Sequence, residues 1–436
     1  MNHIPQILIG AATSGSGKTT FTVGLLRLLR KRGIAVQPFK CGPDYIDTRY
    51  HYLASGCESV NLDLRMADEG HVASLYAHYS VGATATVTEG VMGLFDGYDR
   101  MKGSSAEVAS LLNLPVILVL NARSMAYGVA PLLYGYRHYC SNLRVVGVVF
   151  NQIGSLRHLE LLKQACEDAG LPCLGYLPRL KELEVPSRHL GLTLDVTEQF
   201  DAFAETVAQA IEEYVDVERL LQLCTQPIPC GQPIDSAHRT KALRIGVARD
   251  EAFNFVYREH LDGLKRLGEV VFFSPLRDAS LPSGCDLLYL PGGYPEFFLE
   301  ALEANESMRE QLRHYIENNG RVWAECGGMM YLCQYIKGMD GEPKRMVGIL
   351  PTTATMEGMK LHLGYRSFEL NGQRWNGHEF HYSRLESPCT ELAVATTHDS
   401  GGRPTDTAIY RYKNLFAGYT HLYWGNRDFT TLWTDL

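Results

Sequence analysis

The sequence predicts an α/β protein, with a mostly parallel, doubly wound sheet followed by a second α/β domain. Three observations lead to this prediction. The first half alternates short apolar strands with amphipathic helices, a proline-rich break follows near residues 225–241, and a new buried strand begins at Leu243. The chain has 436 residues, enough for two or three domains of ordinary size.

The strands expected in the first half are apolar runs that suit burial on both faces of a parallel sheet. They lie at residues 7–11, 35–39, 85–89, 116–121 and 145–151, and a helix is expected at 19–32. Apolar runs of this length are far too short to cross a bilayer, so we expect no membrane partner.

The proline-rich break separates the two domains. Three prolines lie within nine residues and show no periodicity, which is typical of a linker. We therefore expect a first domain at 1–224, a linker at 225–241 and a second domain at 242–436. In the second domain we expect α/β strands at 243–247, 286–290, 321–325 and 346–350, then antiparallel strands at 364–370, 391–397 and 408–412.

The charge and cysteine content limit the classes of partner. The formal net charge is −8 and no long basic run is present, so we expect no nucleic acid partner. The nearest basic cluster, Arg27, Arg30, Lys31 and Arg32, is interpreted as a solvated helix end. The 11 cysteines form no C-x-x-C pair and no signal peptide precedes Ile7, so we expect free thiols and a cytoplasmic location.

A glycine-rich loop follows the first strand and opens a helix, which is the setting of a phosphate-binding loop. Ala12 departs from the usual pattern, which has glycine there. Glycines let backbone N–H groups approach phosphate, the lysine neutralises phosphate charge, and the threonine after it can meet Mg²⁺. The residues expected to bind ATP are Thr13, Gly15, Ser16, Gly17, Lys18, Thr19 and Thr20.

Acidic residues follow two further strands and should meet this loop at the carboxyl edge of the sheet. We expect Asp44 and Glu89, with Thr19, to hold Mg²⁺, and Lys40 and Asp47 to bind an anionic substrate. A competing interpretation is that Asp44 and Asp47 cap a helix that starts near residue 46.

Asn151 ends another strand at the same edge of the sheet. The asparagine can read a purine base, which would place it in the ATP site, or it can simply form a turn.

A second reactive site is predicted in the second half, where Cys326 lies between a strand and a helix in a run of small residues. A helix N-terminus lowers the pKa of a thiol and favours a thiolate nucleophile. The N–H groups of Gly327 and Gly293 could form an oxyanion hole. The base remains open among four histidines, which are His362, His378, His381 and His421.

Together these motifs resemble the cobyrinate a,c-diamide synthase family, which includes relatives that act on hydrogenobyrinate. The resemblance covers nearly the whole chain. It rests on the phosphate loop and on five further motifs at residues 42–47, 88–97, 292–296, 324–328 and 377–383.

The resemblance implies an N-terminal P-loop domain similar to dethiobiotin synthetase, which binds Mg²⁺ with ATP, and a C-terminal class I glutaminase domain. It implies Cys326 as nucleophile and His421 as the residue that activates it. Many class I glutaminases have a glutamate two residues after this histidine, where this chain has Tyr423. The orientation of His421 is then unexplained, and Glu379 is one candidate partner.

The implied reaction is ATP-dependent amidation of the a- and c-carboxylates of cobyrinate or hydrogenobyrinate, through an acyl phosphate, in cobalamin biosynthesis. The partners are a corrinoid or related tetrapyrrole, glutamine and ATP. The sequence leaves open which metal the macrocycle carries, the order of the two amidations and the oligomeric state, with a homodimer as one option.

Two alternatives remain. Nickel-sirohydrochlorin a,c-diamide synthase has the same architecture. A partitioning-type ATPase switch belongs to another class, and against it Ser14 occupies the place of the signature lysine of those switches.

Overall fold

The computed structural model describes residues 3–179, 182, 194–232, 234, 242–425 and 427–433. The chain separates into two compact units, Met1–Ile234 and Asp235–Leu436. Each unit contains a large sheet and buried apolar residues of its own, which is the arrangement expected of independently cored domains.

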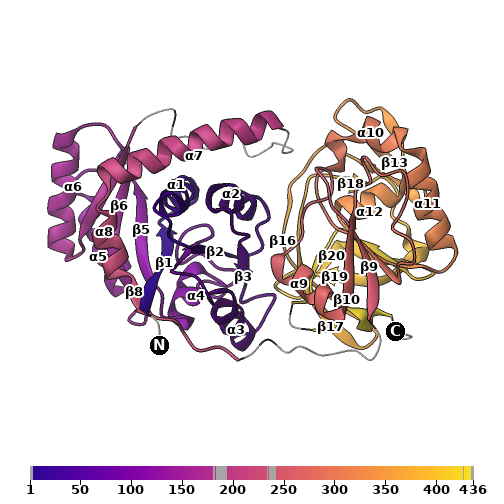
Figure 1. Ribbon diagram of the computed structural model, residues 1–436, viewed down its shortest axis with the longest axis horizontal. Helices are drawn as coiled ribbons and strands as arrows, with labels where there is room; N and C mark the ends of the chain where they lie inside the picture. The colour runs from indigo at the N-terminus through magenta and orange to yellow at the C-terminus, as the bar shows by residue number, and fades with distance from the viewer. Residues whose placement is uncertain are drawn as a thin grey trace. The chain divides into compact units, whose positions relative to one another are not determined.

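The first unit is built on one sheet whose seven main strands are all parallel (Figure 1). In spatial order they are β3 (Val60–Leu62), β2 (Val36–Cys41), β4 (Ala85–Glu89), β1 (His3–Ala11), β5 (Pro115–Asn121), β6 (Arg144–Ile153) and β7 (Cys173–Pro178). The order reverses direction at β1, which confirms the predicted doubly wound sheet. A ligand site is expected where loops from β1 and β4 meet at the carboxyl edge.

Helices cover both faces of this sheet (Figure 1). They are α1 (Lys18–Lys31), α2 (Ile46–Ser55), α3 (Glu69–Tyr79), α4 (Ser105–Leu111), α5 (Val129–His138), α6 (Leu156–Ala169), α7 (Leu194–Tyr214) and α8 (Val217–Leu223). Helix α7 lies across α1, and a β-carbon built on Gly24 would lie 2.4 Å from Val207 Cγ1. The glycine therefore permits a close helix crossing, which holds α1 and the loop before it against the sheet.

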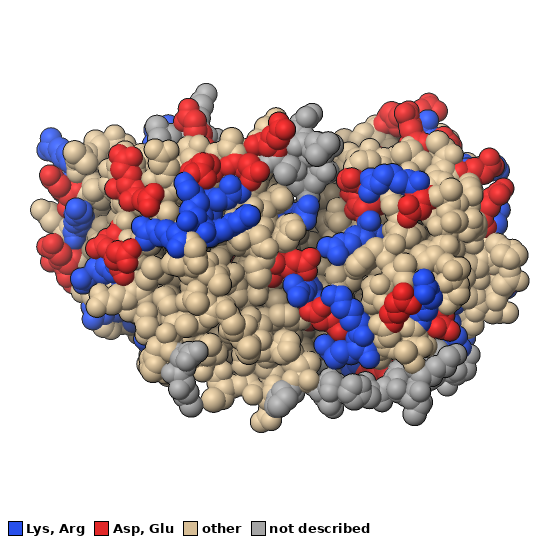
Figure 2. All heavy atoms as spheres, viewed as in Figure 1, with Lys and Arg blue, Asp and Glu red and all other residues tan. Residues whose placement is uncertain are grey.

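The basic cluster at the end of α1 is paired with acidic residues. Arg27 contacts Asp201 of α7 at 2.5 Å, Lys31 contacts Glu205 of α7, and Arg32 contacts Glu218 of α8. Figure 2 shows this group of Lys and Arg side chains bordered by Asp and Glu. The cluster is therefore part of a mixed-charge helix surface.

The connection out of the first unit begins later than expected. Residues Thr225–Pro227 form strand β8, which pairs antiparallel with the start of β1. These residues were predicted to be linker, because prolines disfavour strands, but β8 is a short edge strand where proline is tolerated. The residues at 235–241 lie outside the described part of the chain.

The second unit contains a ten-stranded mixed sheet. Its parallel part has the order β10 (Gly268–Phe273), β9 (Leu243–Ala248), β11 (Leu287–Leu290), β12 (Arg321–Glu325) and β21 (Leu415–Gly418). The sheet continues antiparallel through β20 (Pro404–Tyr412), β19 (Ala393–His398), β16 (His362–Leu370), β17 (Gln373–His381) and β22 (His421–Tyr423). The switch from an α/β pattern to antiparallel strands agrees with the prediction.

The remaining elements of this unit are a small sheet and short helices. The sheet has the order β14 (Pro343–Arg345), β13 (Cys333–Lys337), β15 (Leu350–Thr355) and β18 (Arg384–Leu385). The helices are α9 (Arg258–Leu267), α10 (Leu299–Ala304), α11 (Glu306–Glu317) and α12 (Gly327–Leu332).

The strand predicted at 346–350 is wrong, because β15 begins only at Leu350. The N–H groups of Val347 and Ile349 instead bond to the carbonyls of Tyr331 and Leu332. The apolar run thus closes the C-terminal end of α12 as a buried loop.

Among the described residues, none of the helices combines the length and apolar character needed to cross a bilayer.

Candidate active sites

The predicted phosphate loop connects β1 to α1. Gly15 has a φ of 75° and Gly17 a φ of 99°, a left-handed backbone that favours glycine. Ser16 Oγ donates to the carbonyl of Thr13 at 2.9 Å and closes the loop on itself. This curled backbone at a helix N-terminus is the geometry that binds phosphate in other proteins.

Asn151, at the end of β6, supports the phosphate loop. Its side-chain amide donates to the carbonyl of Ser16 at 3.1 Å, and a β-carbon on Gly17 would lie 2.1 Å from Asn151 Nδ2. The side chain is thus used to hold the loop. Its proposed reading of a purine base remains a prediction.

The residue expected to neutralise phosphate charge, Lys18, begins helix α1. Its Nζ donates to the carbonyl of Met92 at 2.5 Å, so the loop that follows β4 reaches the phosphate loop. The N–H of Leu94 also bonds to the carbonyl of Ala11 at 2.7 Å. The expectation that the loops after β1 and β4 meet at one edge of the sheet is therefore met.

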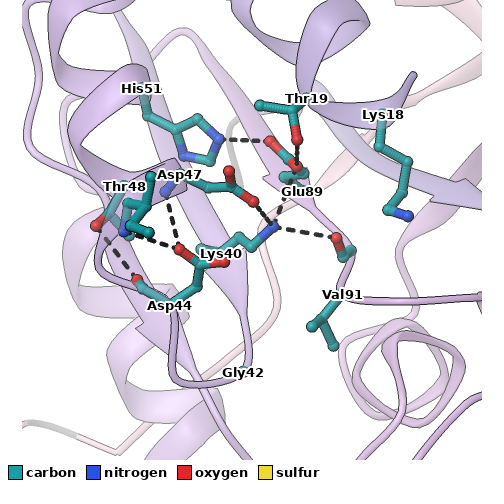
Figure 3. A network of polar contacts seen from close by, with 12 residues as sticks. Lys18, Thr19, Lys40, Gly42, Asp44, Asp47, Thr48, His51, Glu89 and Val91 are labelled. Atoms are coloured by element: carbon teal, nitrogen blue, oxygen red, sulfur yellow. Dashed lines mark hydrogen bonds and ion pairs between the residues drawn. The ribbon is translucent and has the colours of Figure 1, made fainter. Parts of the chain in front are cut away.

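Beside this loop lies a buried network of charged side chains centred on Glu89 (Figure 3). The Thr19 hydroxyl donates to Glu89 Oε1 at 2.7 Å, and Lys40 Nζ lies 3.1 Å from the same oxygen. Lys40 Nζ also lies 2.5 Å from Asp47 Oδ2, and His51 Nε2 lies 2.8 Å from Glu89 Oε2. Two strands, β2 and β4, and two helices, α1 and α2, thus contribute to one polar cluster.

The pKa values follow from burial and mutual charge. Burial alone would lower the pKa of Lys40, but the charges of Asp47, Glu89 and Asp44 raise it above its ordinary value. Burial alone would raise the pKa of Glu89, but Lys40 and His51 hold it below its ordinary value. Burial, followed by the charge of Asp44, raises the pKa of Asp47, and the ammonium of Lys40 opposes that rise. Lys40 and Glu89 therefore form a charged pair inside the unit.

Two residues of this cluster, Asp44 and Lys40, have contacts within the protein, and their predicted roles toward Mg²⁺ and substrate remain predictions. Asp44 Oδ1 accepts the N–H groups of Ile46 at 2.9 Å and Asp47 at 2.8 Å, so this carboxylate caps α2, as the competing interpretation had it. Lys40 is only 2% exposed and its ammonium is surrounded by protein oxygens, including the carbonyl of Gly90. A lysine so enclosed stabilises the acidic residues, and its contact with substrate remains a prediction.

His51 is a member of the cluster that sequence reasoning missed. It is fully buried between Glu89 and Ser59, with Nδ1 3.0 Å from Ser59 Oγ. One signal could have found it. Asp47 and His51 are four residues apart on a helix, which places them on the same face.

The residues that fit a magnesium ion best are Thr19 and Glu89. Both present oxygen atoms at the start of α1, and Mg²⁺ bound with a nucleotide usually takes one or two protein oxygens, phosphates and water. Within the described ranges, no group of three or more His, Cys, Asp or Glu side chains could hold a metal ion alone. A site completed by nucleotide phosphates is consistent with that finding.

The predicted nucleophile, Cys326, occupies the turn between β12 and α12. Its φ is 45° and its ψ is −106°, a conformation that costs a non-glycine residue free energy and is characteristic of functional turns. Its N–H bonds to the carbonyl of Gly418 at 2.8 Å, which fixes the turn against β21.

The two predicted oxyanion donors approach each other at this turn. A β-carbon on Gly327 would lie 3.1 Å from both Gly293 N and Gly293 O. The small residues therefore allow the loop after β11 to pass directly beside the nucleophile turn. Both backbone N–H groups belong to the same small region, as an oxyanion hole requires.

The pKa of the Cys326 thiol is raised, not lowered as the sequence suggested. Burial is the largest cause, the charge of Glu296 is the next, and the N–H of Gly327 opposes them only in part. Helix α12 has six residues, so its dipole is small. Because the thiol is held protonated, the nucleophile needs a base.

Among the four candidate histidines, His421 is the one joined to this turn. It is fully buried on β22, and a β-carbon on Gly292 would lie 2.2 Å from His421 Cε1. The loop that contacts Gly327 through Gly293 therefore contacts His421 through Gly292. This continuity supports the base that the family resemblance implied.

The other three histidines contact aromatic and polar groups of their own, and one of them also contacts His421. His378 stacks on His421 with ring centroids 5.0 Å apart, and its Nδ1 lies 3.2 Å from the Tyr257 hydroxyl. Burial, followed by the charge of His421, holds the pKa of His378 well below its ordinary value. His381 stacks on Tyr419 at 3.9 Å, and His362 stacks on His381 at 4.9 Å.

Glu379, the candidate partner of His421, has other contacts. It accepts from Arg366 Nε at 2.8 Å, Thr407 Oγ1 at 2.7 Å and Thr420 Oγ1 at 3.0 Å. The carboxylate recorded beside His421 is that of Glu325, with Oε2 3.7 Å from His421 Nδ1. The suggestion that Glu379 orients His421 is therefore not supported.

Family models match both halves of the chain. Residues 7–192 match the CobQ/CobB/MinD/ParA nucleotide binding domain, and residues 244–429 match the CobB/CobQ-like glutamine amidotransferase domain. A cobyrinate a,c-diamide synthase from Caldanaerobacter subterraneus is 40% identical over 95% of this chain and 94% of its own length. The chain belongs to the cobyrinate a,c-diamide synthase family.

Further members of the family are similar to this chain at slightly lower identity. A cobyrinate a,c-diamide synthase from Dehalococcoides mccartyi is 38% identical over 97% of this chain and 96% of its own length. A hydrogenobyrinate a,c-diamide synthase from Brucella suis is 38% identical over 95% of this chain and 97% of its own length. Among solved structures, a glutamine amidotransferase is 20% identical over 41% of this chain and 89% of that chain, with a TM-score of 0.30.

Proposed function

We propose that this chain is a ligase that amidates the a- and c-carboxylates of cobyrinate or hydrogenobyrinate in cobalamin biosynthesis, with ATP as energy source and glutamine or ammonia as nitrogen donor. The proposal is supported by similarity, along nearly the whole chain, to relatives named cobyrinate a,c-diamide synthase and hydrogenobyrinate a,c-diamide synthase. The two local geometries, a curled phosphate loop and a strained thiol turn, support the two half-reactions.

The first half-reaction activates the carboxylate. An oxide ion is a very poor leaving group, so a carboxylate oxygen first attacks the γ-phosphorus of ATP and ADP leaves. Ammonia then attacks the acyl carbon and inorganic phosphate leaves, which gives the amide. Lys18 and the N–H groups of Gly15 and Gly17 would hold the phosphates.

The acidic cluster would prepare the metal side of this site. Thr19 and Glu89 would hold Mg²⁺, which when bound neutralises charge that develops on the transferred phosphoryl group. Lys40 and His51 keep Glu89 ionised, so that its carboxylate is available as a ligand. Asp47 pairs with Lys40 and so limits how far that lysine can move.

The second half-reaction releases ammonia from glutamine. His421 takes the proton from Cys326, and the thiolate attacks the amide carbon. The N–H groups of Gly293 and Gly327 stabilise the oxyanion, His421 returns the proton to the departing ammonia, and a thioester remains. Water then hydrolyses the thioester to glutamate and restores the thiol.

The observation that carries the proposal is the continuous contact from Gly327 through Gly293 and Gly292 to His421. It joins a strained cysteine turn, two backbone donors and an imidazole in one place. A chain that worked only as a nucleotide-dependent switch would have no use for that arrangement, so the ligase is preferred to a partitioning-type ATPase.

The variant Cys326→Ser tests the proposal. Serine keeps the volume nearly unchanged but replaces the thiol with a hydroxyl that hardly ionises, so glutamine-dependent amidation should fall by at least about a hundredfold. Amidation with high ammonium at alkaline pH should continue, because the phosphate loop does not use the thiol. The measurement is the paired rate of amide formation with glutamine and with ammonium salt. A folded variant that loses both rates, or keeps both, would contradict the two-site assignment.

Mass spectrometry of the products would identify the substrate. Cobyrinate, hydrogenobyrinate and nickel-sirohydrochlorin are offered separately with ATP and glutamine, and two carboxylates should become amides on one of the first two. Diamide formed only on the nickel compound would overturn the corrinoid assignment. All 11 cysteines are free thiols, which supports a cytoplasmic enzyme, and the homodimer remains a prediction.

A further inference from the structure

Glu325 immediately precedes the nucleophile, yet the proposed mechanism gives it no role. It is the last residue of β12, its side chain is fully buried, and it lies in the parallel part of the sheet. A carboxylate enclosed in this way is costly unless its oxygens are satisfied, so its contacts indicate what it does.

Both oxygens of Glu325 are held by fixed donors. Oε1 accepts from Trp323 Nε1 at 2.7 Å and from the N–H of Leu422 at 2.9 Å. Oε2 accepts from the Tyr289 hydroxyl at 2.9 Å. The carboxylate is thus anchored from β11, β12 and β22, and it has little freedom to turn.

The anchored carboxylate lies beside the imidazole of the proposed base. Glu325 Oε2 is 3.7 Å from His421 Nδ1. The Leu422 N–H that holds Oε1 belongs to the residue directly after His421, so the same carboxylate fixes the backbone and lies beside the ring. A shift of a few tenths of an ångström in the ring would bring Nδ1 into hydrogen-bonding distance.

The residue that does this task in many glutaminases is absent. Tyr423 stands two positions after His421, where many glutaminases have a glutamate, and its ring packs edge-on against Tyr257 and at a tilt against His260. Glu379 is committed to Arg366, Thr407 and Thr420.

We infer that Glu325 positions His421. This inference rests on the proposed function and adds a partner for the base. The partner lies at the end of the strand that directly precedes the nucleophile. Glu325 holds the proton of the neutral ring on Nδ1, which leaves Nε2 to accept the Cys326 proton. When the ring becomes an imidazolium, the nearby negative charge stabilises it.

The decisive variant is Glu325→Gln in the full chain. Glutamine keeps the shape and can still accept from Trp323 and Leu422, but it removes the charge beside Nδ1. We expect kcat for glutamine hydrolysis to fall at least about tenfold, as for the loss of a general-base partner, while KM for glutamine changes less than about twofold. Ammonia-dependent amidation should not change.

The matched control is Glu379→Gln, another buried carboxylate in the same sheet. It should reduce kcat for glutamine hydrolysis much less, since the groups that hold Glu379 are Arg366, Thr407 and Thr420. The thermal midpoint of each variant shows whether it is folded. If Glu325→Gln does not fold, Glu325→Asp keeps the charge but withdraws it from the ring by one carbon, and kcat should still fall at least about threefold.

A folded Glu325→Gln variant with nearly normal kcat would overturn the inference, as would an equal loss of kcat in Glu379→Gln. If Glu325→Gln does not fold, an unchanged kcat in Glu325→Asp would also overturn the inference. These outcomes differ from failure of the proposed function, in which the unmodified protein would hydrolyse no glutamine or Cys326→Ser would retain that activity.

Discussion

The phosphate-loop site and the thiol site are organised by different forces. In the first, side chains of opposite charge neutralise one another, with Lys40 between Asp47 and Glu89 and His51 behind them. In the second, backbone conformation positions the reactive groups, through the strained Cys326 turn and the close approach of Gly293 to Gly327.

This difference matches the charges of the proposed ligands. ATP is a highly charged anion, so its site needs fixed positive charge and ionised metal ligands. The amide group of glutamine is neutral, so its site needs a shaped surface, a proton acceptor and two backbone donors. Loss of a charged residue around the phosphate loop should therefore lower amidation with either nitrogen donor, whereas loss of the proton carrier in the second site should abolish only the use of glutamine.

The largest effect is expected for Lys18→Ala. Removing the lysine at the start of α1 leaves phosphate charge without its cation, and activation of the carboxylate precedes amide formation with either nitrogen donor. Amidation should fall by at least about a hundredfold with both glutamine and ammonium, because stabilisation of a charged transition state is lost. The measurement is amide formation with each donor at saturating ATP. Normal turnover with ammonium would show that the loop does not serve the reaction.

The next effect is expected for His421→Asn. Without the imidazole, the buried thiol keeps its proton, because burial and Glu296 hold the pKa of Cys326 above its usual value. Glutamine-dependent amidation should fall by at least about a hundredfold, while ammonium-dependent amidation persists. His378→Asn and His381→Asn serve as controls and should have smaller effects in the same paired assay. A greater loss in His381→Asn would show that the base has been assigned to the wrong histidine.

A smaller effect on chemistry is expected for Glu89→Gln. Amidation should require more Mg²⁺ and fall by about tenfold at saturating Mg²⁺, whereas glutamine hydrolysis should change little. The comparison is the Mg²⁺ dependence of the two rates. An unchanged Mg²⁺ dependence would assign Glu89 a purely structural role.

Glu89→Gln should also lower the free energy of unfolding, by about 3–5 kcal/mol, because Lys40 and His51 lose a buried partner. The direction of this change in the free energy of unfolding follows from the pKa of Glu89. Since the folded-state pKa of Glu89 is below its ordinary value, its charge stabilises the fold at neutral pH, and this contribution is lost as pH falls through the folded value. Urea unfolding at neutral pH measures the difference between variant and unmodified protein.

Local patterns predicted the fold and the position of each reactive loop. The parallel strands follow from apolar runs between helices, and the phosphate loop and Cys326 turn follow from glycine and small residues at strand ends. Each of these signals lies within about ten residues of sequence, where periodicity and backbone preference decide the structure.

The parts of the two sites that the sequence did not predict depend on contacts between distant segments. Sequence reasoning could place Lys40 near an acidic edge, but not enclose it between Asp47 and Glu89, which depends on how β2, β4 and α2 pack. Glu325 likewise meets His421 only because β12 and β22 belong to one sheet, about a hundred residues apart in the chain. The raised pKa of Cys326 depends on burial, which a local motif does not encode.

Strand β8 has a practical consequence for anyone who wishes to produce the first unit by itself. Gln6 is fully buried in β1, and its side-chain amide donates to the carbonyls of Gln226 and Pro227 at 2.9 Å each. A fragment that stopped at residue 224 would lack both acceptors and leave the buried amide of Gln6 without them. Its free energy of unfolding should fall by about 1–3 kcal/mol. A terminus placed after Pro227 keeps the two acceptors. A separately expressed nucleotide-binding unit should therefore include the three residues of β8.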